Sequence, residues 1–304
     1  MLYCLLAYLL NHMKLSVITV TWNNGKTIEK QLQSVQKGAA GLELEQIVID
    51  NGSSDNIVEI MTKYPQVKFI KNDKNLGFGA ANNQGYKIAT GDYVLFLNPD
   101  NEVEENSLLK LCEMMEKSPD IGLLSCKLTK QDGNFNTDAG PRHFPTVLNQ
   151  LALLLKVPHL FPKVLDKYLM KDFDSEKQQE VDTVRGAFML LRKSALDKLG
   201  WGFDPRYFIW FEDIDLCREI KKMNLKVIYT PIVTCVDLIG QSFVQRTNLW
   251  KQKNFTASML KYFQKWEPWY MWIWIAIFRP VAIFMVWLKE KMGKNNSDKI
   301  RVSL

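Results

Sequence analysis

Four short groups of acidic and amide residues have side chains that could bind a nucleotide, hold a metal ion and remove a proton. The first is Asp50-Asn51-Gly52-Ser53-Ser54-Asp55, which directly follows an apolar run. A carboxylate at the end of a buried strand can accept a hydrogen bond from the ring N–H of a pyrimidine base, which is the chemistry we assign to Asp50. A tight turn followed by a helix N-cap explains the same residues without a ligand.

The second group, Leu97-Asn98-Pro99-Asp100, ends another apolar run. Proline stops a strand and rigidifies the turn, so Asp100 is expected to point outward. There it can bind a divalent cation that also holds phosphate oxygens. The alternative is a plain Asn-Pro turn.

The third group places Glu212, Asp213 and Asp215 at a predicted helix start. A single acid would be enough to complement the helix dipole. Aromatic neighbours desolvate a carboxylate and raise its pKa, whereas the helix N-terminus lowers it, so this is a candidate position for a general base. The neighbours are Tyr207, Phe208, Trp210 and Phe211.

The fourth group, Asn75 to Gly85, begins like a dinucleotide-binding fingerprint but has Asn82 in place of the third glycine. It also follows the third predicted strand instead of the first, which argues against nicotinamide binding. Its small residues indicate close helix packing or a close approach to a bound nucleotide.

Alternating strands and helices must position these groups. Predicted strands cover 15–21, 46–49, 67–70 and 93–97, with helices at 27–36, up to 63, after 85, and at 107–117. In the second half, a strand is predicted near 122–127, followed by an insertion without a clear pattern at 138–179. Regular structure resumes at 181–192, with helices at 194–199 and from 212 and a strand at 226–230. This alternation predicts a parallel sheet between helices, with ligands bound outside the carboxyl ends of the strands.

The composition is that of a folded globular chain. The 304 residues are 47% hydrophobic and 24% charged, which excludes a disordered or polytopic membrane protein. The net charge of +6 suits an anionic ligand or a phospholipid surface and is too diffuse to indicate nucleic acid. Five scattered cysteines indicate neither a disulfide framework nor a zinc site.

With these motifs in order, the chain resembles family 2 of the inverting nucleotide-sugar glycosyltransferases from about Lys14 to Ser242. The segments N-L-G-F, L-N-P-D and E-D-x-D-L are similar to those of the subgroup that transfers rhamnose from dTDP-rhamnose to cell-surface glycans. The resemblance implies an α/β fold of the GT-A type, with a Rossmann-like nucleotide-binding half and a mixed, mostly parallel central sheet flanked by helices.

The resemblance also implies roles for individual residues. Asp50 corresponds to the base-binding residue, Asp100 to the last acid of the D-x-D metal motif, and Asp213 to the catalytic base. Gly186 corresponds to a small residue that leaves room for the sugars. The implied nucleotide and donor site is Thr21, Asn23, Asp50, Asn51, Ser53, Asn75, Gly77, Asn83, Asn98, Asp100 and Gly186. Glu212 and Asp215 are the implied acceptor-side or helix-start carboxylates.

Two positions depart from the family pattern. Asn98 stands where many members have the first acid of D-x-D, and Asp237 stands where many have a histidine. An Asp at 237 can still ligate Mg²⁺ or Mn²⁺, so Asp100 and Asp237 are the expected metal ligands. The implied reaction is a single displacement from a nucleotide-diphosphate sugar to a glycan or lipid-linked glycan. The alternatives are a catalytically silent nucleotide-sugar-binding or scaffold protein and, more distantly, a nicotinamide-dependent oxidoreductase.

The two chain ends are apolar. Residues 1–12 lack the basic region and cleavage site of a secretory signal, and Met13 is a second possible start. Pro268 to Leu288 carries one charge, Arg279, followed by Pro280, and has basic flanks and many tryptophans. This predicts a helix pair lying in the membrane interface, at the cytoplasmic face of the cell membrane, although an apolar helix packed on the core fits the same pattern.

The domain boundaries expected from these features are 1–265 for the glycosyltransferase domain and 266–304 for the membrane-associated segment. The first divides into a nucleotide-sugar half at 14–127 and an acceptor half at 128–245. On this division, removing 266–304 is expected to release the protein from membranes and leave the site intact.

Overall fold

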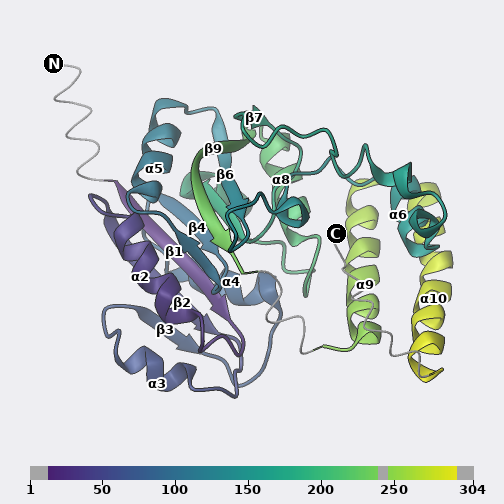
Figure 1. Cartoon of the computed structure of the whole chain (residues 1–304), viewed down its shortest axis with the longest axis horizontal. Coiled ribbons are helices and arrows are strands. Elements are labelled where there is room, and N and C mark those ends of the chain that lie inside the picture. Colours follow the sequence, from purple (N-terminus) through teal and green to yellow (C-terminus); the bar gives the residue numbers. More distant parts are fainter. Residues whose placement is uncertain (1–12, 239–245, 293–304) are drawn as a thin grey trace.

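The computed structural model describes residues 13–238 and 246–292 (Figure 1). Its strands are β1 (Lys14–Thr21), β2 (Glu43–Asp50), β3 (Lys68–Lys71), β4 (Tyr93–Leu97), β5 (Asn101–Val103), β6 (Ile121–Thr129), β7 (Gln179–Glu180), β8 (Phe188–Arg192) and β9 (Lys226–Asp237). Its helices are α2 (Ile28–Gly38), α3 (Ile57–Thr62), α4 (Phe78–Ile88), α5 (Ser107–Lys117), α6 (Val147–Leu154), α7 (Lys193–Leu199), α8 (Glu212–Lys222), α9 (Asn248–Trp266) and α10 (Trp269–Lys291). Short 3₁₀ helices are η1 (Thr137–Ala139), η2 (Val157–His159) and η3 (Pro162–Leu165). The expectations for residues 1–12, for 239–242 and for the basic residues after 292 concern parts of the chain outside the described ranges.

The strands form one sheet in the order β3-β2-β1-β4-β8-β6-β9-β5, with β7 on the side of β9. Pairing is parallel from β3 through β2 and β1 to β4, and again between β6 and β9. The antiparallel strand β8 lies between these two parallel groups. The expected mixed sheet is therefore confirmed, with its continuous parallel part in the N-terminal half.

The strand order reverses at β1, which pairs with β2 on one side and with β4 on the other. The chain runs from β1 through α2 to β2 on one side, and returns from β3 through α4 to β4 on the other side of β1. A crevice forms at the carboxyl ends of the strands at such a reversal. The register aligns Thr21 with Asp50 at this edge. Two of the expected nucleotide-binding residues thus lie side by side at the reversal point.

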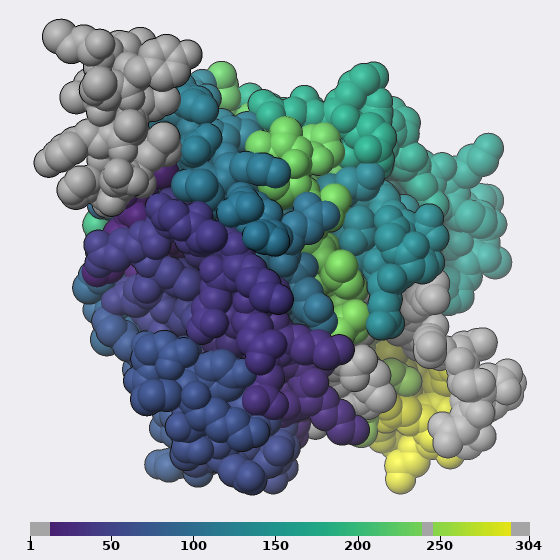
Figure 2. Space-filling model, turned by 60° about the vertical axis from the view of Figure 1, so that its left-hand side comes forward, coloured from purple at the N-terminus to yellow at the C-terminus, as the bar shows by residue number. Residues whose placement is uncertain are grey.

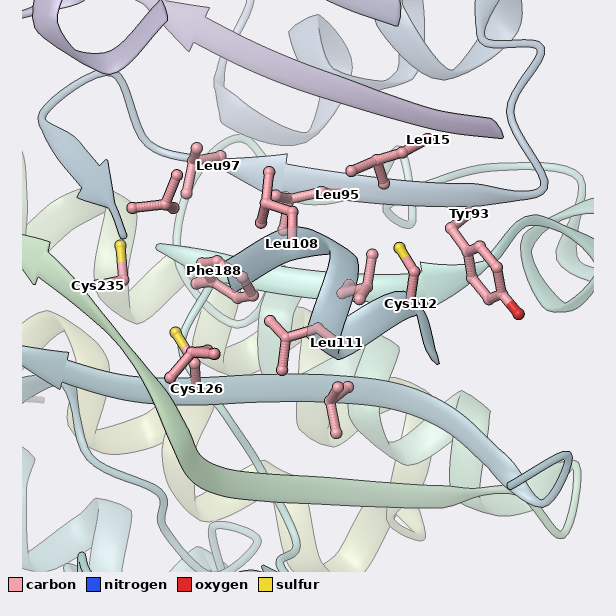
Figure 3. Packing of buried hydrophobic residues seen from close by; sticks show 14 of the residues in the cluster. Leu15, Tyr93, Leu95, Leu97, Leu108, Leu111, Cys112, Cys126, Phe188 and Cys235 are labelled. Atoms are coloured by element: carbon pink, nitrogen blue, oxygen red, sulfur yellow. The ribbon is translucent and has the colours of Figure 1, made fainter. Parts of the chain in front are cut away.

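Apolar strands with helices on both faces build the core. All five residues of β4 are buried, as expected for a strand covered on both sides. On one face, β1, β4 and β8 pack against α2 and α5, where Leu108, Leu111 and Cys112 fill the interior (Figure 3). On the other face, α4, α7 and α8 contribute the buried side chains. The sheet edge that carries the polar residues is therefore held rigidly from both sides.

Several elements differ from the sequence-based expectation. The helix α4 begins at Phe78, inside the segment expected to precede it. The insertion at 138–179 contains α6, capped by Thr146, whose Oγ1 accepts the N–H of Asn149. The C-terminal apolar stretch is one continuous helix with Pro280 inside it, so the expected helix pair within this stretch is wrong. Nearby helices supply the contacts that keep a proline-containing helix in place.

Helices α9 and α10 stand together at the edge of the molecule away from β1 and β3, with α6 beside α10 (Figure 1). In the space-filling view, the purple and blue N-terminal half covers one side and the yellow side chains of α10 gather at the lower edge (Figure 2). One face of α10 is packed, because Ile275 and Ala282 are buried in a cluster with Tyr207 and Phe211. Among the described helices, α10 alone is long and apolar enough to cross a membrane, and 17% of its most apolar window is buried.

Candidate active site

Asp50 and Thr21 form a buried polar pair at the ends of β2 and β1. Both side chains are fully buried, and Oδ1 of Asp50 accepts the backbone N–H of Ser53 at 3.0 Å. The second carboxylate oxygen of Asp50 and the hydroxyl of Thr21 have no hydrogen-bond partner. Buried polar atoms without partners are costly, so this pair is suited to a ligand that supplies one donor and one acceptor.

The loops that follow β1 and β2 are tied together by Asn23 and Ser53. The backbone N–H of Asn23 donates to Ser53 Oγ at 2.8 Å, and Asn23 Oδ1 accepts the backbone N–H of Ser54 at 2.8 Å. These bonds join residues 30 and 31 positions apart in sequence. Asn23 and Ser53 thus hold together the two loops beside Asp50.

Asn51 connects these loops to the start of α4. Its Nδ2 donates to the Gly77 carbonyl at 3.1 Å and to Asn75 Oδ1 at 3.2 Å, while its Oδ1 accepts the N–H of Leu76. Gly77 has a φ of +94°, and a Cβ atom there would collide with the carbonyl oxygen of Phe208. Glycine is required at this position because both the backbone conformation and the close approach exclude a side chain.

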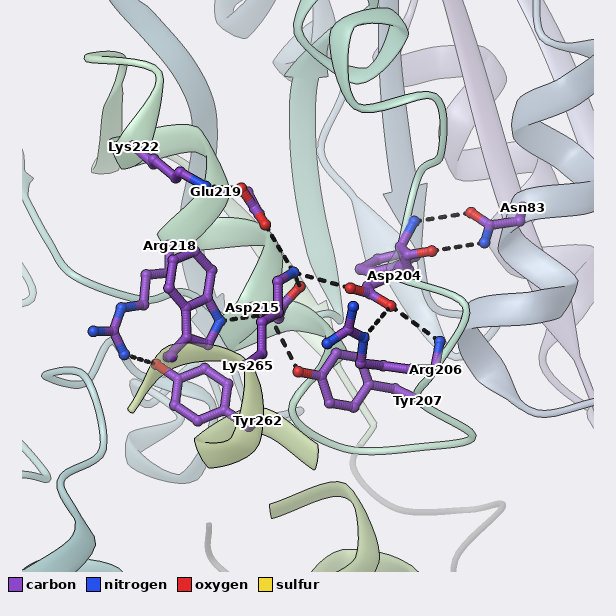
Figure 4. Close-up of polar contacts among 12 residues, drawn as sticks. Asn83, Asp204, Arg206, Tyr207, Asp215, Arg218, Glu219, Lys222, Tyr262 and Lys265 are labelled. Carbon is purple, nitrogen blue, oxygen red and sulfur yellow. Dashed lines mark hydrogen bonds and ion pairs between the residues drawn. The ribbon is translucent and has the colours of Figure 1, made fainter. Parts of the chain in front are cut away.

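Asn83 was expected to bind the donor, but its side chain is hydrogen-bonded to a loop of the protein. Its Oδ1 accepts the backbone N–H groups of Gly202 and Phe203 at 2.9 and 2.8 Å, and its Nδ2 donates to the Phe203 carbonyl at 2.7 Å (Figure 4). Both lone pairs of the amide oxygen are thus used by the loop before α8. Asn83 therefore positions that loop, which carries the aromatic residues ahead of Asp213.

Asp100 and Asp237 lie on adjacent segments of the chain at the sheet edge. Residue 101 is paired with Asp237 between β5 and β9, and Leu238 N–H points to the carbonyl of Asp100 at 3.4 Å. Both carboxylates are 7% exposed, and burial raises the pKa of Asp100. Asn136 Nδ2 donates to Asp237 at 3.1 Å. Asn98 lies next to them, its backbone N–H bonded to the carbonyl of Ala187.

These residues fit a divalent cation of the kind that binds with substrate phosphates. Burial alone raises the pKa of the Asp100 carboxyl, and a bound cation would favour its ionised form. Within residues 13–238 and 246–292 there is no cluster of three or more acidic, His or Cys ligands. Mg²⁺ commonly takes only one or two carboxylates and completes its shell with water and phosphate oxygens, so two are sufficient.

Asp213 is the second residue of α8 and is half-buried. Its Oδ2 accepts the backbone N–H of Gly186 at 3.1 Å, and its Oδ1 accepts the N–H of Ile214 at 2.8 Å. Each oxygen keeps a further lone pair, so the carboxylate is held in one orientation and can still accept a proton. Trp210 and Phe211, directly before the helix, both have φ near +68°, at 67° and 69°. Such strained backbone in non-glycine residues is characteristic of functional sites.

Glu212, next to Asp213, is buried and its Oε2 has no hydrogen-bond partner. Burial raises the pKa of Glu212, and the negative charge of Asp213 raises it further. The two adjacent carboxyl groups therefore have different roles. Burial favours the neutral form of Glu212, and Asp213 is the less buried of the two.

Asp215 faces away from this crevice. It is fully buried, where Lys265 Nζ and Trp266 Nε1 of α9 each donate to it at 2.7 Å and the Tyr207 hydroxyl donates at 3.2 Å. Figure 4 shows Lys265 between Asp204, Asp215 and Glu219, with which it forms three ion pairs. Asp215 is thus a helix-start carboxylate that docks α9. Its oxygens accept from Tyr207 and from α9, which favours this alternative over the acceptor-side one.

Three arginines near the site were not identified from the sequence. Arg142 and Arg185 lie close to Asp213, whose charge acts on the buried Arg142. Arg246 stacks over the rings of Trp22 and Trp250, with 4.2 and 4.8 Å from its guanidinium carbon to the ring centroids. Arg185 precedes Gly186 in the sequence and could have been noticed there. Arg142 lies in the unpatterned insertion and Arg246 has no local motif.

The family model for glycosyl transferase family 2 matches residues 16–200, which run from within β1 to just past α7 and include Thr21, Asp50 and Asp100 but neither Asp213 nor Asp237. The chain belongs to glycosyl transferase family 2. The resemblance drawn from the motifs is therefore confirmed, and the chain is a glycosyltransferase.

Curated relatives of this glycosyltransferase act on different glycans. It is 26% identical over 229 residues to an N-acetylglucosaminyl-diphospho-decaprenol L-rhamnosyltransferase of Mycobacterium tuberculosis, covering 71% of this chain and 73% of the relative. It is also 26% identical over 243 residues to a poly-beta-1,6-N-acetyl-D-glucosamine synthase of Staphylococcus epidermidis, covering 79% of this chain. That synthase is matched over only 52% of its own length.

Solved structures confirm the GT-A fold of this family 2 member. A Pyrobaculum calidifontis mannosyltransferase in complex with GDP-Man and Mn²⁺ matches with a TM-score of 0.56, at 16% identity, over 96% of this chain and 81% of its own. Residues 1–349 of S. aureus TarS in complex with UDP-GlcNAc match with a TM-score of 0.54, at 19% identity, over 82% of this chain and 65% of its own. At these identities the likeness concerns the fold alone.

Proposed function

We propose that this glycosyltransferase transfers a sugar, with inversion, from a nucleoside-diphosphate donor to a hydroxyl of a lipid-linked or cell-surface glycan. The observation that carries the proposal is Asp213, a half-buried carboxylate at a strained helix start whose two oxygens are oriented by backbone N–H groups. Such a group has the geometry of a general base because it is fixed, reachable and keeps an acceptor position.

The reaction is a single displacement. Asp213 takes the proton of the acceptor hydroxyl while that oxygen forms a bond to the anomeric carbon of the donor sugar. The bond from the anomeric carbon to the diphosphate oxygen breaks on the opposite face, so the configuration inverts. Gly186 has no side chain beside Asp213, where both sugars must meet, and a Cβ there would already contact Asp213 and Phe78. Holding the two reactants in line is the main contribution that the protein makes.

The donor is expected to carry a uracil or thymine base. Both bases have a ring N–H beside carbonyl oxygens, which matches the free carboxylate oxygen of Asp50 and the hydroxyl of Thr21. The similarity to a rhamnosyltransferase, together with the E-D-x-D-L segment, supports dTDP-rhamnose as the donor. Asp50 and Thr21 would bind the base, so they do not distinguish between donors with different sugars.

Asp100 and Asp237 are the residues that would hold a divalent cation, Mg²⁺ or Mn²⁺, with Asn98 beside them. Bound there, the cation would neutralise charge on the departing diphosphate. Asp100 and Asp237 would hold the positive charge of the cation at the carboxyl ends of β4 and β9, on the same sheet edge as Asp50.

The exposed face of α10 supports attachment to a membrane surface, at the cytoplasmic face, where nucleotide sugars are available. Its exposed apolar side chains are Trp269, Tyr270, Met271, Trp274, Ile277, Val281, Phe284, Trp287 and Leu288. The single charge on the packed side, Arg279, donates to Thr256 of α9. A helix with one packed and one apolar exposed face, rich in tryptophan, fits a position in the plane of the interface better than a crossing of the bilayer.

The test is a panel of nucleotide sugars, dTDP-rhamnose and UDP-N-acetylglucosamine among them, assayed for nucleoside diphosphate release with membrane extract as acceptor. Release from dTDP-rhamnose that requires the extract supports the full proposal. Release from another donor alone would retain the reaction and overturn the sugar. Binding of donors without any release would favour the second candidate, a silent nucleotide-sugar-binding protein, which is motivated by Asn98 and Asp237 in place of the usual residues.

A further inference from the structure

Arg142 is a buried cation with an unused donor. Its side chain is 5% exposed, Nη2 donates to the carbonyl of Asp138 at 3.3 Å, and Nη1 has no hydrogen-bond partner. Neither Arg142 nor Arg185 forms an ion pair within 4 Å among the described residues. A guanidinium that is buried without a counter-ion is expensive, since the lost hydration is not replaced.

Arg185 lies on the same face as Arg142. Arg142 and Thr183 form an isolated antiparallel bridge, with N–H to carbonyl distances of 3.3 and 3.1 Å. Side chains two residues apart share a face of an extended segment, so Arg185 is the diagonal neighbour of Arg142. Burial, together with the positive charge of Arg185, lowers the pKa of Arg142 to about 10. The two cations therefore repel each other unless an anion joins them.

The arginine pair, Arg142 and Arg185, also adjoins the catalytic carboxylate. Gly186, the residue after Arg185, donates its N–H to Asp213, and the groups whose charges act on Arg142 are Arg185, Tyr168 and Asp213. An anion at this pair would lie next to the hydroxyl that Asp213 deprotonates. Phosphate is the anion whose geometry matches two guanidinium groups, each of which can donate two parallel hydrogen bonds.

The position of the pair in the chain indicates which substrate brings the phosphate. Arg142 comes from the insertion between β6 and β8, which continues into α6, and α6 packs against α10 in one apolar cluster (Figure 1). The same insertion exposes Leu148 and Leu160, at 79% and 78%, and Phe161. The arginine pair is thus joined through the insertion to the apolar side of the molecule, whereas Asp50 belongs to the N-terminal half.

We propose that Arg142 and Arg185 bind the phosphate of an anionic, lipid-linked acceptor and thereby place its sugar hydroxyl at Asp213. This inference rests on the proposed function, because it assigns the acceptor side of the same crevice. It names the acceptor class as a glycan joined to a lipid through phosphate or diphosphate.

The test measures binding without turnover. The probe is farnesyl diphosphate, with farnesol as the neutral control and dTDP as a donor-side probe, each titrated by calorimetry into the full chain. We expect farnesyl diphosphate to bind, and Arg142→Gln and Arg185→Gln each to weaken it by about tenfold or more, the scale of one lost charge-assisted hydrogen bond. The affinity for dTDP should be unchanged, and Lys171→Gln, an exposed lysine of the same insertion, should change neither.

Each other outcome counts against the inference. Equal loss of dTDP affinity would assign the arginines to the donor diphosphate, and equal binding of farnesol would show that only the apolar chain is recognised. If Arg142→Gln does not fold, Arg185→Gln decides the question, because Arg185 is half-buried. Failure of the proposed function would instead appear as no nucleoside diphosphate release by the wild-type protein, whatever farnesyl diphosphate does.

Discussion

Gly186 donates its backbone N–H to Oδ2 of Asp213 over 3.1 Å, although the two residues are 27 positions apart. A Cβ atom on Gly186 would lie 3.5 Å from the Cβ of Asp213 and 3.6 Å from the ring of Phe78. These are ordinary contact distances, and the backbone of Gly186 is not in the left-handed region. The fold therefore tolerates a methyl group at this position, and any requirement for glycine comes from the substrates that approach Asp213.

Gly186→Ala is expected to fold normally, and Gly186→Val is expected to lower kcat/KM by about 100-fold, because its branches would fill the space where the sugars meet. Thermal unfolding and donor binding should change little in the alanine variant. A valine variant with full activity would show that the sugars approach Asp213 from another side.

Asp213→Asn is expected to lower the transfer rate by about 10²- to 10⁴-fold while donor binding is retained, since the amide keeps the shape and cannot take a proton. Nucleoside diphosphate release and calorimetric binding of the donor are the two measurements. Asp197→Asn on α7, which pairs with Lys193 outside the site, is the matched control. Wild-type rates from the Asp213 variant would remove it from the mechanism.

Glu212 should make the protein less stable as pH rises. Burial raises the pKa of Glu212 from 4.5 to about 8, so the folded protein holds a proton that the unfolded chain has released between these pH values. The free energy of unfolding then falls with rising pH, by at most about 1.4 kcal/mol per pH unit for one proton.

Glu212→Gln removes this titration. The unfolding temperature of the variant relative to wild type should therefore increase from pH 4.5 to pH 8. A difference that stays constant across this range would show that Glu212 is ionised in the folded protein.

Divalent cations should be required for transfer, because Asp100 and Asp237 are buried carboxylates on adjacent segments of the sheet edge and could bind a metal that also holds the diphosphate. We expect EDTA to abolish activity, Mg²⁺ or Mn²⁺ to restore it, and Asp100→Ala to raise the metal concentration needed. Asp120→Asn, at an exposed ion pair with Lys226, serves as the control. Full activity of Asp100→Ala in EDTA would show that the L-N-P-D segment is only a structural turn.

Membrane attachment is better tested by substitution than by deletion. Removing 266–304 would also remove Trp266, which donates to Asp215, and would uncover the cluster that contains Phe211. The expectation that this deletion leaves the site intact is therefore revised, because α10 packs on residues that position Asp213.

Replacing Trp274, Ile277 and Phe284 by serine should release the protein from vesicles of phosphatidylglycerol and phosphatidylcholine without changing its unfolding temperature. All three side chains are more than half exposed, so they contribute little to folding. Ile275→Ser, on the buried face, should instead destabilise the fold and leave binding of the folded fraction intact. Unchanged flotation of the triple variant would exclude this face as the attachment surface.

Much of the nucleotide-sugar half, residues 14–127, could be predicted because its strands and turns follow from local sequence patterns. The apolar runs before Asp50 and Asp100 are buried strands, and the helix expected at 107–117 matches the observed bounds of α5, Ser107–Lys117. Parallel strands bring their carboxyl ends to one edge, so the neighbouring positions of Thr21 and Asp50 follow from the pattern as well.

The amino-acid sequence by itself determined the order of strands and helices in the first half and the presence of Asp213 at a helix start, since burial and capping act over a few neighbouring residues. Only the tertiary structure decided which polar groups face the crevice. Asp213 and Asp215 differ by two positions, yet one meets Gly186 and the other is taken up by Lys265 of α9. Likewise, Arg142 reaches Arg185 through a bridge formed 41 positions along the chain. Contacts between residues so far apart depend on how whole elements pack, and that packing leaves no periodic trace in the sequence.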